Sequence, residues 1–370
     1  MNTYSLRLLF FVSCLLILVA CQPVVPTSSN PADLTQSTAS STASDVQSQL
    51  ATLPDIGTIK IGYLPIVAFA PLMVADAKGY FAEQGLNVEL VPFQAGSFMV
   101  APLSIGELDA ALPIELSAGL FNAIANELDI RIVGSHTIFD EETPIYLLVR
   151  KDLFDSGEIT KISDMLGHKV SIPGPRGLAE FAVASALANA GLSIDDVELV
   201  TLPFPEAPGA LANEAIDLAY LADPLATKAQ RDGTATVLLP VGQMIGHDIQ
   251  MTGVMLGRRL LEPANREIAV RVLMAFFKAV RNDLVGDYNQ NPEIISILEK
   301  YTKLPTAVVQ SINPYTMVRD GTMQEAGIME MQKYFIDRQY LEYSELLPLE
   351  KIIDPSFTQE AIKRLEQAGE

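Results

Sequence analysis

Short apolar runs alternate with amphipathic stretches along the chain after residue 55. The runs are rich in Ile, Val and Leu, as in buried strands, and apolar residues recur at helical spacing between them. This strand and helix alternation predicts an α/β fold with mainly parallel sheets. We expect strands at 59–63, 88–91, 109–112, 130–133, 169–172, 197–200, 217–220 and 237–239, helices beginning near Ala70, Ser97, Glu115 and Leu178, a helix around Ala210, and a mostly helical segment from Arg266 onward.

An internal repeat divides this pattern into two halves. The run Val88 to Phe93 recurs as Val197 to Phe204, and Leu108 to Leu112 recurs as Ile216 to Tyr220, at an offset of 108 to 109 residues. The repeat predicts two topologically similar α/β lobes. One large doubly wound sheet is the alternative.

The loops after the expected strands are the candidate chemical positions. Ligands of open α/β sheets lie outside the carboxyl ends of the strands. At offset 108, Glu115 corresponds to Asp223, so each half has a carboxylate after an equivalent strand, at or near the start of a helix. Both carboxylates could face a ligand. Both could equally be helix-start acids favoured by the helix dipole, and Asp223 followed by Pro224 is typical of an N-cap.

The N-terminal segment has the pattern of an export signal. After Arg7, an apolar run from Leu8 to Ala20 is too short to cross a bilayer, and Leu18 to Cys21 resembles the bacterial lipobox. We expect residues 1–20 to be a lipoprotein signal peptide and Cys21 to be the lipidated N-terminus. An ordinary signal peptide with a chance cysteine is the alternative. Residues 21–55, rich in Ser, Thr and Pro, are expected to be a flexible tether.

Composition restricts the function classes. The 370 residues are 49% hydrophobic and carry 45 acidic against 25 basic side chains, a net charge of −20. This acidic balance argues against nucleic acid as a partner. The two Cys residues exclude a disulfide scaffold.

A family resemblance rests on several motifs of the first half. The segments Gly62 to Pro65, Ala70 to Ala75 and Lys78 to Leu90 resemble the opening of the periplasmic solute-binding proteins for nitrate, sulfonates, taurine, thiamine-pyrimidine precursors and riboflavin. The block Leu103 to Asp109, followed by Leu120 to Ile124, is similar to the next strand and helix of that family. The resemblance covers about residues 59–220.

The resemblance implies a two-lobe periplasmic-binding-protein fold of type II, with two parallel-type sheets joined by two crossover strands and closing around a solute. Mapped onto this chain, the crossovers are Ile145 to Arg150 and Thr252 to Leu256. Lobe one then comprises residues 56–143 plus 251–370, and lobe two comprises residues 144–250.

The sequence carries none of three common enzymatic motifs. The sequence lacks a zinc-protease His-Glu-x-x-His, a Gly-x-Ser-x-Gly elbow and a P-loop, and its three His are 136, 168 and 247. We therefore expect no catalytic residues, no metal site and no cofactor. Gly174 to Gly177, with Arg176, could cradle an anion or simply turn the chain.

The expected cleft is rich in aromatic side chains and poor in cations. Carboxylates beside aromatic rings suit a planar heterocycle with N–H donors, although the same rings could belong to the core. We therefore expect a small aromatic heterocycle as ligand, riboflavin first and a thiamine-pyrimidine precursor next. The candidate ligand-binding residues are Phe69, Gly96, Ser97, Phe98, Glu115, Ser117, His136, Arg176, Phe204, Tyr220 and Asp223.

Together these expectations describe a transport protein. The resemblance implies the substrate-binding component of an ABC-type importer, with permease and ATPase subunits as partners. The lipobox places it on the extracytoplasmic face of the cell membrane through a lipid anchor. Two alternatives stay open: a binding protein for nitrate, sulfonate or taurine, and a surface interaction protein that kept the fold without transport.

Overall fold

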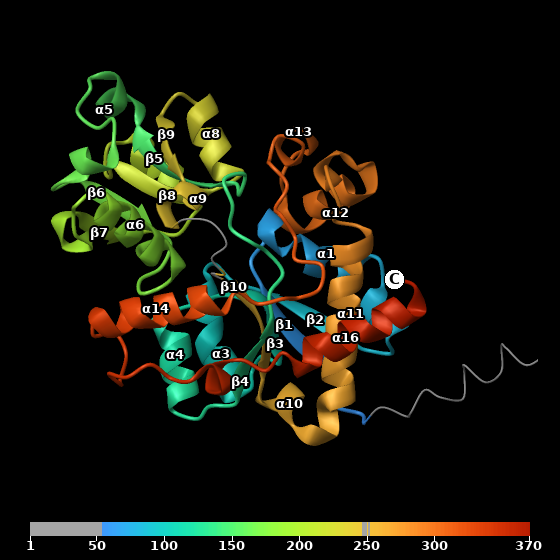
Figure 1. The fold of residues 1–370 in the computed structure, drawn as a ribbon. Helices are drawn as coiled ribbons and strands as arrows, with labels where there is room; N and C mark the ends of the chain where they lie inside the picture. Colours follow the sequence, from blue (N-terminus) through green and yellow to red (C-terminus); the bar gives the residue numbers. More distant parts are fainter. Residues whose placement is uncertain (1–53, 246–249, 251) are drawn as a thin grey trace, which may run out of the picture. The chain divides into compact units, whose positions relative to one another are not determined.

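The computed structural model describes residues 54–245, 250 and 252–370. The signal peptide 1–20, Cys21 and all of the tether except residues 54 and 55 lie outside the described residues, so these expectations stay predictions. Within the described part, ten strands form two five-stranded sheets (Figure 1).

The first sheet has the order β2-β1-β3-β10-β4. Strands β1, β2 and β3 pair in parallel, whereas β10 lies antiparallel between β3 and β4. Its strands are β1 (Ile59–Tyr63), β2 (Val88–Pro92), β3 (Ala110–Glu115), β4 (Ile130–Gly134) and β10 (Thr252–Gly257).

The second sheet repeats this arrangement with the order β7-β6-β8-β5-β9. Here β5 is the antiparallel strand, between β8 and β9. Its strands are β5 (Ile145–Arg150), β6 (Lys169–Ile172), β7 (Glu198–Thr201), β8 (Leu218–Ala222) and β9 (Ala235–Pro240).

The sheet type corrects one expectation. Both sheets are mixed rather than purely parallel, because the chain enters the second sheet through β5 and returns to the first through β10, and each of these strands runs against its neighbours. The lobe boundaries at residues 143 and 251 stay a prediction. The sheet membership itself is clear, since the first sheet takes strands from 59–134 and 252–257 and the second from 145–240.

The helices cover the sheets, as the alternating pattern predicts. In the described ranges, six short 3₁₀ turns, among them η1 (Val67–Phe69) and η2 (Gly96–Met99), lie between the regular elements. The α-helices are α1 (Ala70–Ala77), α2 (Tyr80–Glu83), α3 (Val100–Ile105), α4 (Ala118–Ala125), α5 (Lys151–Asp155), α6 (Leu178–Asn189), α7 (Ala207–Ala212), α8 (Leu225–Arg231), α9 (Val241–Ile245), α10 (Arg258–Leu261), α11 (Arg266–Asn282), α12 (Pro292–Thr302), α13 (Thr306–Val309), α14 (Glu325–Asp337), α15 (Leu349–Ile352) and α16 (Ser356–Ala368).

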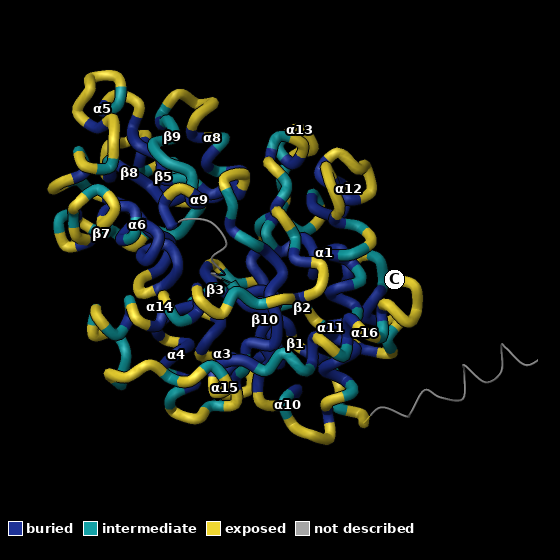
Figure 2. Tube along the Cα trace, viewed as in Figure 1, coloured by how far each residue is buried: buried dark blue, intermediate teal, exposed yellow. Residues whose placement is uncertain are grey.

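The core follows from the burial of the strands on both faces. Every residue of β8 is buried, and Lys60 is the one exposed residue of β1, as expected for strands covered by helices on two sides. Figure 2 shows the buried residues concentrated in the strands and the inward faces of the helices. The long helix α11 buries Phe276 and Phe277 completely and packs on α1 and α16.

The helix that we expected to begin near Glu115 begins three residues later. Glu115 is the last residue of β3, and α4 begins three residues later at Ala118, with the Ser117 hydroxyl accepting a hydrogen bond from Leu120 N–H at 3.4 Å. Ser117 therefore takes the capping role, because its side chain reaches the free N–H groups of the first turn. The Glu115 carboxylate projects from the end of a strand and is not a helix cap.

Candidate functional site

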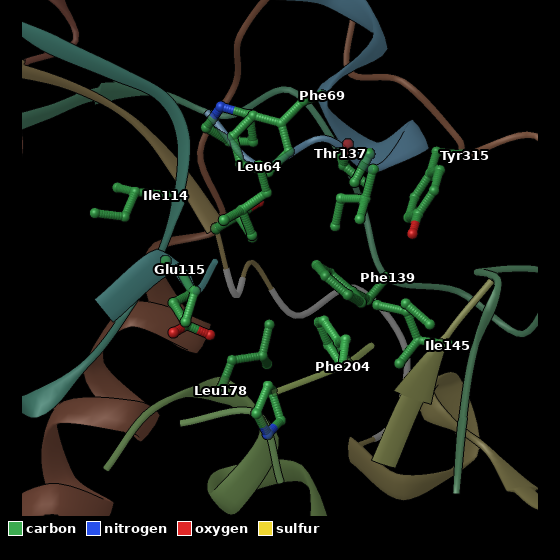
Figure 3. Close-up of a pocket in the computed structure, with 18 of the residues that line it drawn as sticks. Leu64, Phe69, Ile114, Glu115, Thr137, Phe139, Ile145, Leu178, Phe204 and Tyr315 are labelled. Carbon is green, nitrogen blue, oxygen red and sulfur yellow. The ribbon is translucent and has the colours of Figure 1, made fainter. Parts of the chain in front are cut away.

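A pocket lies between the strand ends of the two sheets. The empty space within its lining, open solvent included, is about 740 Å³. Its walls come from the loops after β1 and β2, the end of β3, the segment that links β4 to β5, the first residues of β5 and β10, the loops after β6 and β7, the end of β8, and the segment that holds Tyr315 (Figure 3). The lining residues are Leu64, Ile66, Ala68, Phe69, Ala95, Gly96, Pro113, Ile114, Glu115, His136, Thr137, Phe139, Ile145, Pro173, Leu178, Phe204, Tyr220, Ala222, Thr252 and Tyr315.

The lining is mainly apolar and aromatic. Figure 3 shows Leu64, Phe139, Leu178 and Phe204 around one common space, with the Glu115 carboxylate at its side. Among the described lining residues Glu115 is the one acidic side chain, and none is Lys or Arg. A pocket of this composition favours an apolar ring with few polar atoms, because an uncompensated anion would lose its hydration without gaining a cation.

Glu115 is held where the two sheets meet. Its Oε1 accepts a hydrogen bond from Ser97 N–H at 3.1 Å. A side chain on Gly96 would approach the Glu115 Cγ at 3.0 Å, and one on Gly177, in the second half, would lie 3.4 Å from Oε1. Burial raises the pKa of Glu115 from its ordinary value of 4.5 to about 7, although the hydrogen bond from Ser97 opposes the rise.

His136 is neutral and offers an acceptor. Its Nε2 lies 3.2 Å from the Ala68 carbonyl oxygen, which can only accept, so we place the ring proton on Nε2. The other nitrogen, Nδ1, is buried without a hydrogen-bond partner among the described residues. Burial lowers the pKa of His136 from 6.5 to about 4, so the ring carries no charge at neutral pH.

Two further polar groups of the pocket have no partner in the described part of the chain. The Tyr220 hydroxyl and Thr252 Oγ1 are both buried and unpaired. Thr252 lies opposite Glu115 in the pairing of β10 with β3. Burial first, and the charge of Glu115 second, raise the pKa of Tyr220, which therefore keeps its proton. Buried polar groups are normally satisfied, so these atoms indicate the hydrogen bonds that a ligand or ordered water would supply.

The structure brings six of the eleven candidate residues together. Phe69, Gly96, Glu115, His136, Phe204 and Tyr220 line the pocket. The Phe204 and Tyr220 rings are nearly parallel, with centroids 6.5 Å apart and an angle of 21° between their planes. Whether these side chains contact a ligand stays a prediction.

The other five candidates lie outside the pocket lining. Ser97 adjoins Gly96 and binds Glu115 through its backbone, while Phe98 is 52% exposed. Ser117 caps α4, and the Arg176 guanidinium lies 4.8 Å above the Tyr340 ring. Asp223 Oδ1 accepts hydrogen bonds from the Thr227 N–H and hydroxyl, both at 2.8 Å, which is the capping role considered from the sequence.

Sequence reasoning did not select Thr252 and Tyr315 for the pocket. The expected crossover strand at 252 could have identified Thr252, because a return strand begins at the edge where the lobes meet. Tyr315 lies in a segment without regular secondary structure, between α13 and α14, which no periodic pattern marks. Its N–H donates to the Tyr288 hydroxyl oxygen at 2.9 Å, and its ring completes the pocket wall (Figure 3).

Neither metal ligands nor membrane spans are found in the described residues. These residues contain no group of three or more His, Cys, Asp or Glu side chains placed to hold a metal ion. Across the same ranges, no helix combines the length and hydrophobicity that a bilayer crossing requires.

Comparison with curated proteins finds relatives in solute import. The chain is 26% identical over 303 residues to the nitrate import ATP-binding protein NrtC of Synechococcus elongatus, a match covering 76% of this chain and 43% of NrtC. It is 24% identical over 192 residues to the riboflavin-binding protein RibY of Chloroflexus aurantiacus, covering 52% of this chain and 50% of RibY. The chain thus spans half or less of the length of these relatives.

Solved structures share the fold at lower identity. The periplasmic nitrate-binding protein NrtA from Synechocystis PCC 6803 aligns with a TM-score of 0.67 and 17% identity, covering 85% of this chain and 90% of NrtA. The desulfurization enzyme DszB aligns with a TM-score of 0.57 and 14% identity, covering 83% of this chain and 99% of DszB. Both binding proteins and an enzyme therefore use this periplasmic-binding-protein fold.

A family model assigns the chain more directly. The model described as NMT1/THI5 like matches residues 67–280, more than half of the sequence, from η1 through the whole second sheet and into α11. All eleven candidate residues named from the sequence, from Phe69 to Asp223, lie within this range. The chain belongs to the NMT1/THI5-like family.

Proposed function

We propose that the protein is the substrate-binding component of an ABC-type importer, which captures a small aromatic heterocycle between its two sheets and delivers it to a membrane permease. Riboflavin is the favoured ligand and a thiamine-pyrimidine precursor is the second. The protein itself performs no chemical conversion in this proposal, and an ATPase subunit of the importer drives transport.

The composition of the pocket carries the proposal. Aromatic rings contributed by both halves, Phe69 and Phe139 on one side and Phe204 and Tyr220 on the other, can cover a flat ring. Burial of apolar ring surface contributes ~25 cal/mol per Å², before the cost of ordering the ligand. Glu115 can accept an N–H of the heterocycle, and the unpaired hydroxyls of Tyr220 and Thr252 can pair with its carbonyl or ring nitrogen atoms.

The same composition disfavours the anionic alternatives. Nitrate, sulfonates and taurine each present an anionic group that needs cations or several N–H donors. No Lys or Arg is among the described lining residues, and the Glu115 carboxylate would repel an anion. Arg176, the cation proposed for an anion site, directs its guanidinium onto Tyr340.

The relatives support import as the process and leave the solute open. RibY is a riboflavin-binding protein, whereas NrtC is a nitrate import ATP-binding protein. Membership in a family shared by such proteins supports an ABC permease and ATPase as partners. The choice of riboflavin depends on the pocket and not on the relatives alone.

The lipid anchor is a separate part of the proposal. Cys21 lies outside the described residues, and its support is the lipobox-like run Leu18 to Cys21. A Cys21→Ser change should release the protein in soluble or unprocessed form, measured by membrane fractionation and mass spectrometry of the N-terminus. Membrane retention of a fully processed Cys21→Ser protein would contradict the anchor without affecting the ligand proposal.

Calorimetry with four ligands tests the ligand class. Riboflavin, an aminopyrimidine, taurine and nitrate are titrated into the purified full-length protein, and an absorbance scan checks for a flavin that copurifies. We expect binding by one of the two heterocycles, with no turnover, and no heat from the anions. Micromolar binding of taurine or nitrate with neither heterocycle bound would overturn the proposal and make the Gly174 to Gly177 loop the site to test. No binding of any compound would favour the surface interaction protein.

A further inference from the structure

Helix α14 connects the two halves of the molecule. Figure 1 shows it between α4 of the first half and α6 of the second. Phe335 of α14 is fully buried and packs on Phe121 of α4, with ring centroids 6.0 Å apart. The neighbouring Tyr334 packs edge-to-face on Phe181 of α6 at 5.4 Å. One helix, outside the residues matched by the family model, therefore contacts both halves.

Tyr334 also makes a polar contact with a buried carboxylate. Its hydroxyl donates to Glu180 Oε1 at 3.1 Å. Glu180 lies in the first turn of α6 and is 2% exposed. Its second oxygen, Oε2, accepts the backbone N–H of Arg176 at 2.8 Å. A buried carboxyl group requires hydrogen-bond donors on its oxygens. The Glu180 side chain therefore links the Tyr334 hydroxyl to the Arg176 backbone.

The Arg176 backbone in turn touches the pocket wall. Arg176 adopts a left-handed conformation, with φ of 56°, and its carbonyl accepts Ala118 N–H of the first half at 2.9 Å. The next residue, Gly177, lies against the Glu115 carboxylate. Pro173 and Leu178, on either side of this turn, line the pocket. A continuous set of contacts thus leads from α14 to the second-half wall of the pocket.

We infer that Tyr334 and Glu180 are positioning residues of the ligand pocket, which hold the 173–178 turn against Glu115 and Ala118. Neither side chain lines the pocket, so they act through the turn. The inference deepens the proposed function, because its effect on affinity presupposes a ligand in this pocket. Its effect on the turn itself does not depend on the ligand.

Hydrogen exchange of the full-length protein without ligand tests the positioning role. Tyr334→Phe removes the hydroxyl and keeps the ring. Loss of one hydrogen bond to a buried carboxyl group corresponds to about a tenfold change in the equilibrium between the closed and the open turn. We expect exchange about tenfold faster in peptides that contain Ala118 and in peptides that cover 173–178, with peptides of β1 and β10 unchanged.

Two further variants keep the test decisive. Tyr343→Phe is the matched control, because the Tyr343 hydroxyl is buried without a partner in the described part of the chain, and we expect exchange as in the wild type. Glu180→Gln should accelerate exchange at the same peptides as Tyr334→Phe, and the double variant should add less than about threefold, since both changes break one contact set. Faster exchange confined to α14, or no change at Ala118, would overturn the inference.

Riboflavin binding provides the second readout. In Tyr334→Phe, affinity for riboflavin should fall by about the factor seen in exchange, because the open turn must close before the ligand is covered. Unchanged affinity in a variant with accelerated exchange would contradict a role in the pocket. If riboflavin does not bind the wild type, the proposed ligand is wrong, while the exchange data still decide whether Tyr334 and Glu180 hold the turn.

Discussion

The two halves of the molecule agree at one edge of their sheets and differ at the other. At the edge where β3 and β8 begin, Asp109 Oδ2 accepts Lys60 N–H at 2.7 Å, and Asp217 Oδ2 accepts Lys169 N–H at 3.0 Å. In each half the second carboxylate oxygen accepts a hydrogen bond from an arginine at or just after the end of the antiparallel strand, Arg259 in the first and Arg150 in the second. At this edge the sequence repeat is therefore accompanied by equivalent hydrogen bonds in the two halves.

At the opposite edge, the equivalent carboxylates have different surroundings. Glu115 ends β3, faces the pocket and accepts one backbone N–H, from Ser97. Asp223 follows β8, and its Oδ1 accepts both the N–H and the hydroxyl of Thr227 in the first turn of α8. Of these two carboxylates, Glu115 lines the pocket and Asp223 does not.

From this difference we propose that one edge of the two sheets serves stability and the other serves ligand binding. The edge that keeps the same contacts in both halves links the side chains of Asp109 and Asp217 to neighbouring strands, whereas at the carboxyl ends of the strands the side chains of Glu115 and Asp223 have different partners. We therefore expect changes at the Asp109 edge to affect unfolding and changes at Glu115 to affect ligand affinity.

The largest effect is expected at Asp109. Asp109→Asn should lower the free energy of unfolding by about 3 kcal/mol, since it leaves the Arg259 guanidinium beside a neutral group at a site where the aspartate side chain is 3% exposed. Asp217→Asn should cost only about 1 kcal/mol, because Asp217 is 21% exposed and Arg150 keeps its pair with Asp152. Urea denaturation measures both, and equal losses would contradict the ranking.

Glu115 should give the next largest effect, on binding. Glu115→Gln should weaken binding of the heterocycle tenfold to a hundredfold, about 1.5–3 kcal/mol, because an amide is a weaker acceptor for a buried donor. Asp223→Asn is the matched variant and should change affinity less than Glu115→Gln. Calorimetry compares the two. Equal and unchanged affinities would show that both carboxylates are structural.

The shared edge and most of the fold could be predicted from the sequence. Runs such as Ile59 to Tyr63 identify strands because burial on both faces demands continuous apolar residues, and the offset of 108 to 109 residues aligns Asp109 with Asp217. The antiparallel course of β5 and β10 did not follow from these runs, since strand direction depends on which sheet the chain joins next.

The binding edge was only partly predictable for a different reason. Glu115 and Asp223 occupy equivalent positions in the two halves. Position alone therefore does not tell which of the two carboxylates accepts hydrogen bonds from a neighbouring side chain. The sequence indicated a cap at Asp223 through Pro224, whereas the packing of Gly96 and Gly177 around Glu115 required the folded chain. Tyr315 reaches the pocket from a segment far along the chain without periodicity, so local patterns could not place it.

A pH dependence of stability sharpens the assignment of Glu115. The folded protein keeps the Glu115 proton up to its raised pKa of about 7, whereas the unfolded chain releases it near 4.5. Stability from this group is therefore highest below pH 4.5 and falls as the pH rises through 7, the reverse of an ion-paired carboxylate. Between pH 5 and pH 8 the loss should be about 2 kcal/mol in the wild type.

The Glu115→Gln variant isolates this dependence. Because Gln does not titrate, the free energy of unfolding of the variant should rise by about 2 kcal/mol relative to that of the wild type between pH 5 and pH 8, as measured by urea denaturation. His136, whose pKa is lowered to about 4, titrates in both proteins, so its contribution cancels in the difference. If the difference in free energy of unfolding between the two proteins stayed constant from pH 5 to pH 8, the Glu115 carboxylate would be solvated like an exposed acid.

The smallest expected effect concerns the second half and completes the comparison. Asp223→Ala removes the acceptor of the Thr227 N–H and hydroxyl, so the first turn of α8 loses its cap and the free energy of unfolding should fall by about 1 kcal/mol. Asp223→Asn keeps an acceptor oxygen at the same position and should lose less than half of that. Because Asp223 does not line the pocket, the affinity for the heterocycle should change less than twofold in either variant. A tenfold loss of affinity in Asp223→Ala at unchanged stability would reverse the assignment, since the carboxylate of the second half would then face the ligand as the carboxylate of the first half does.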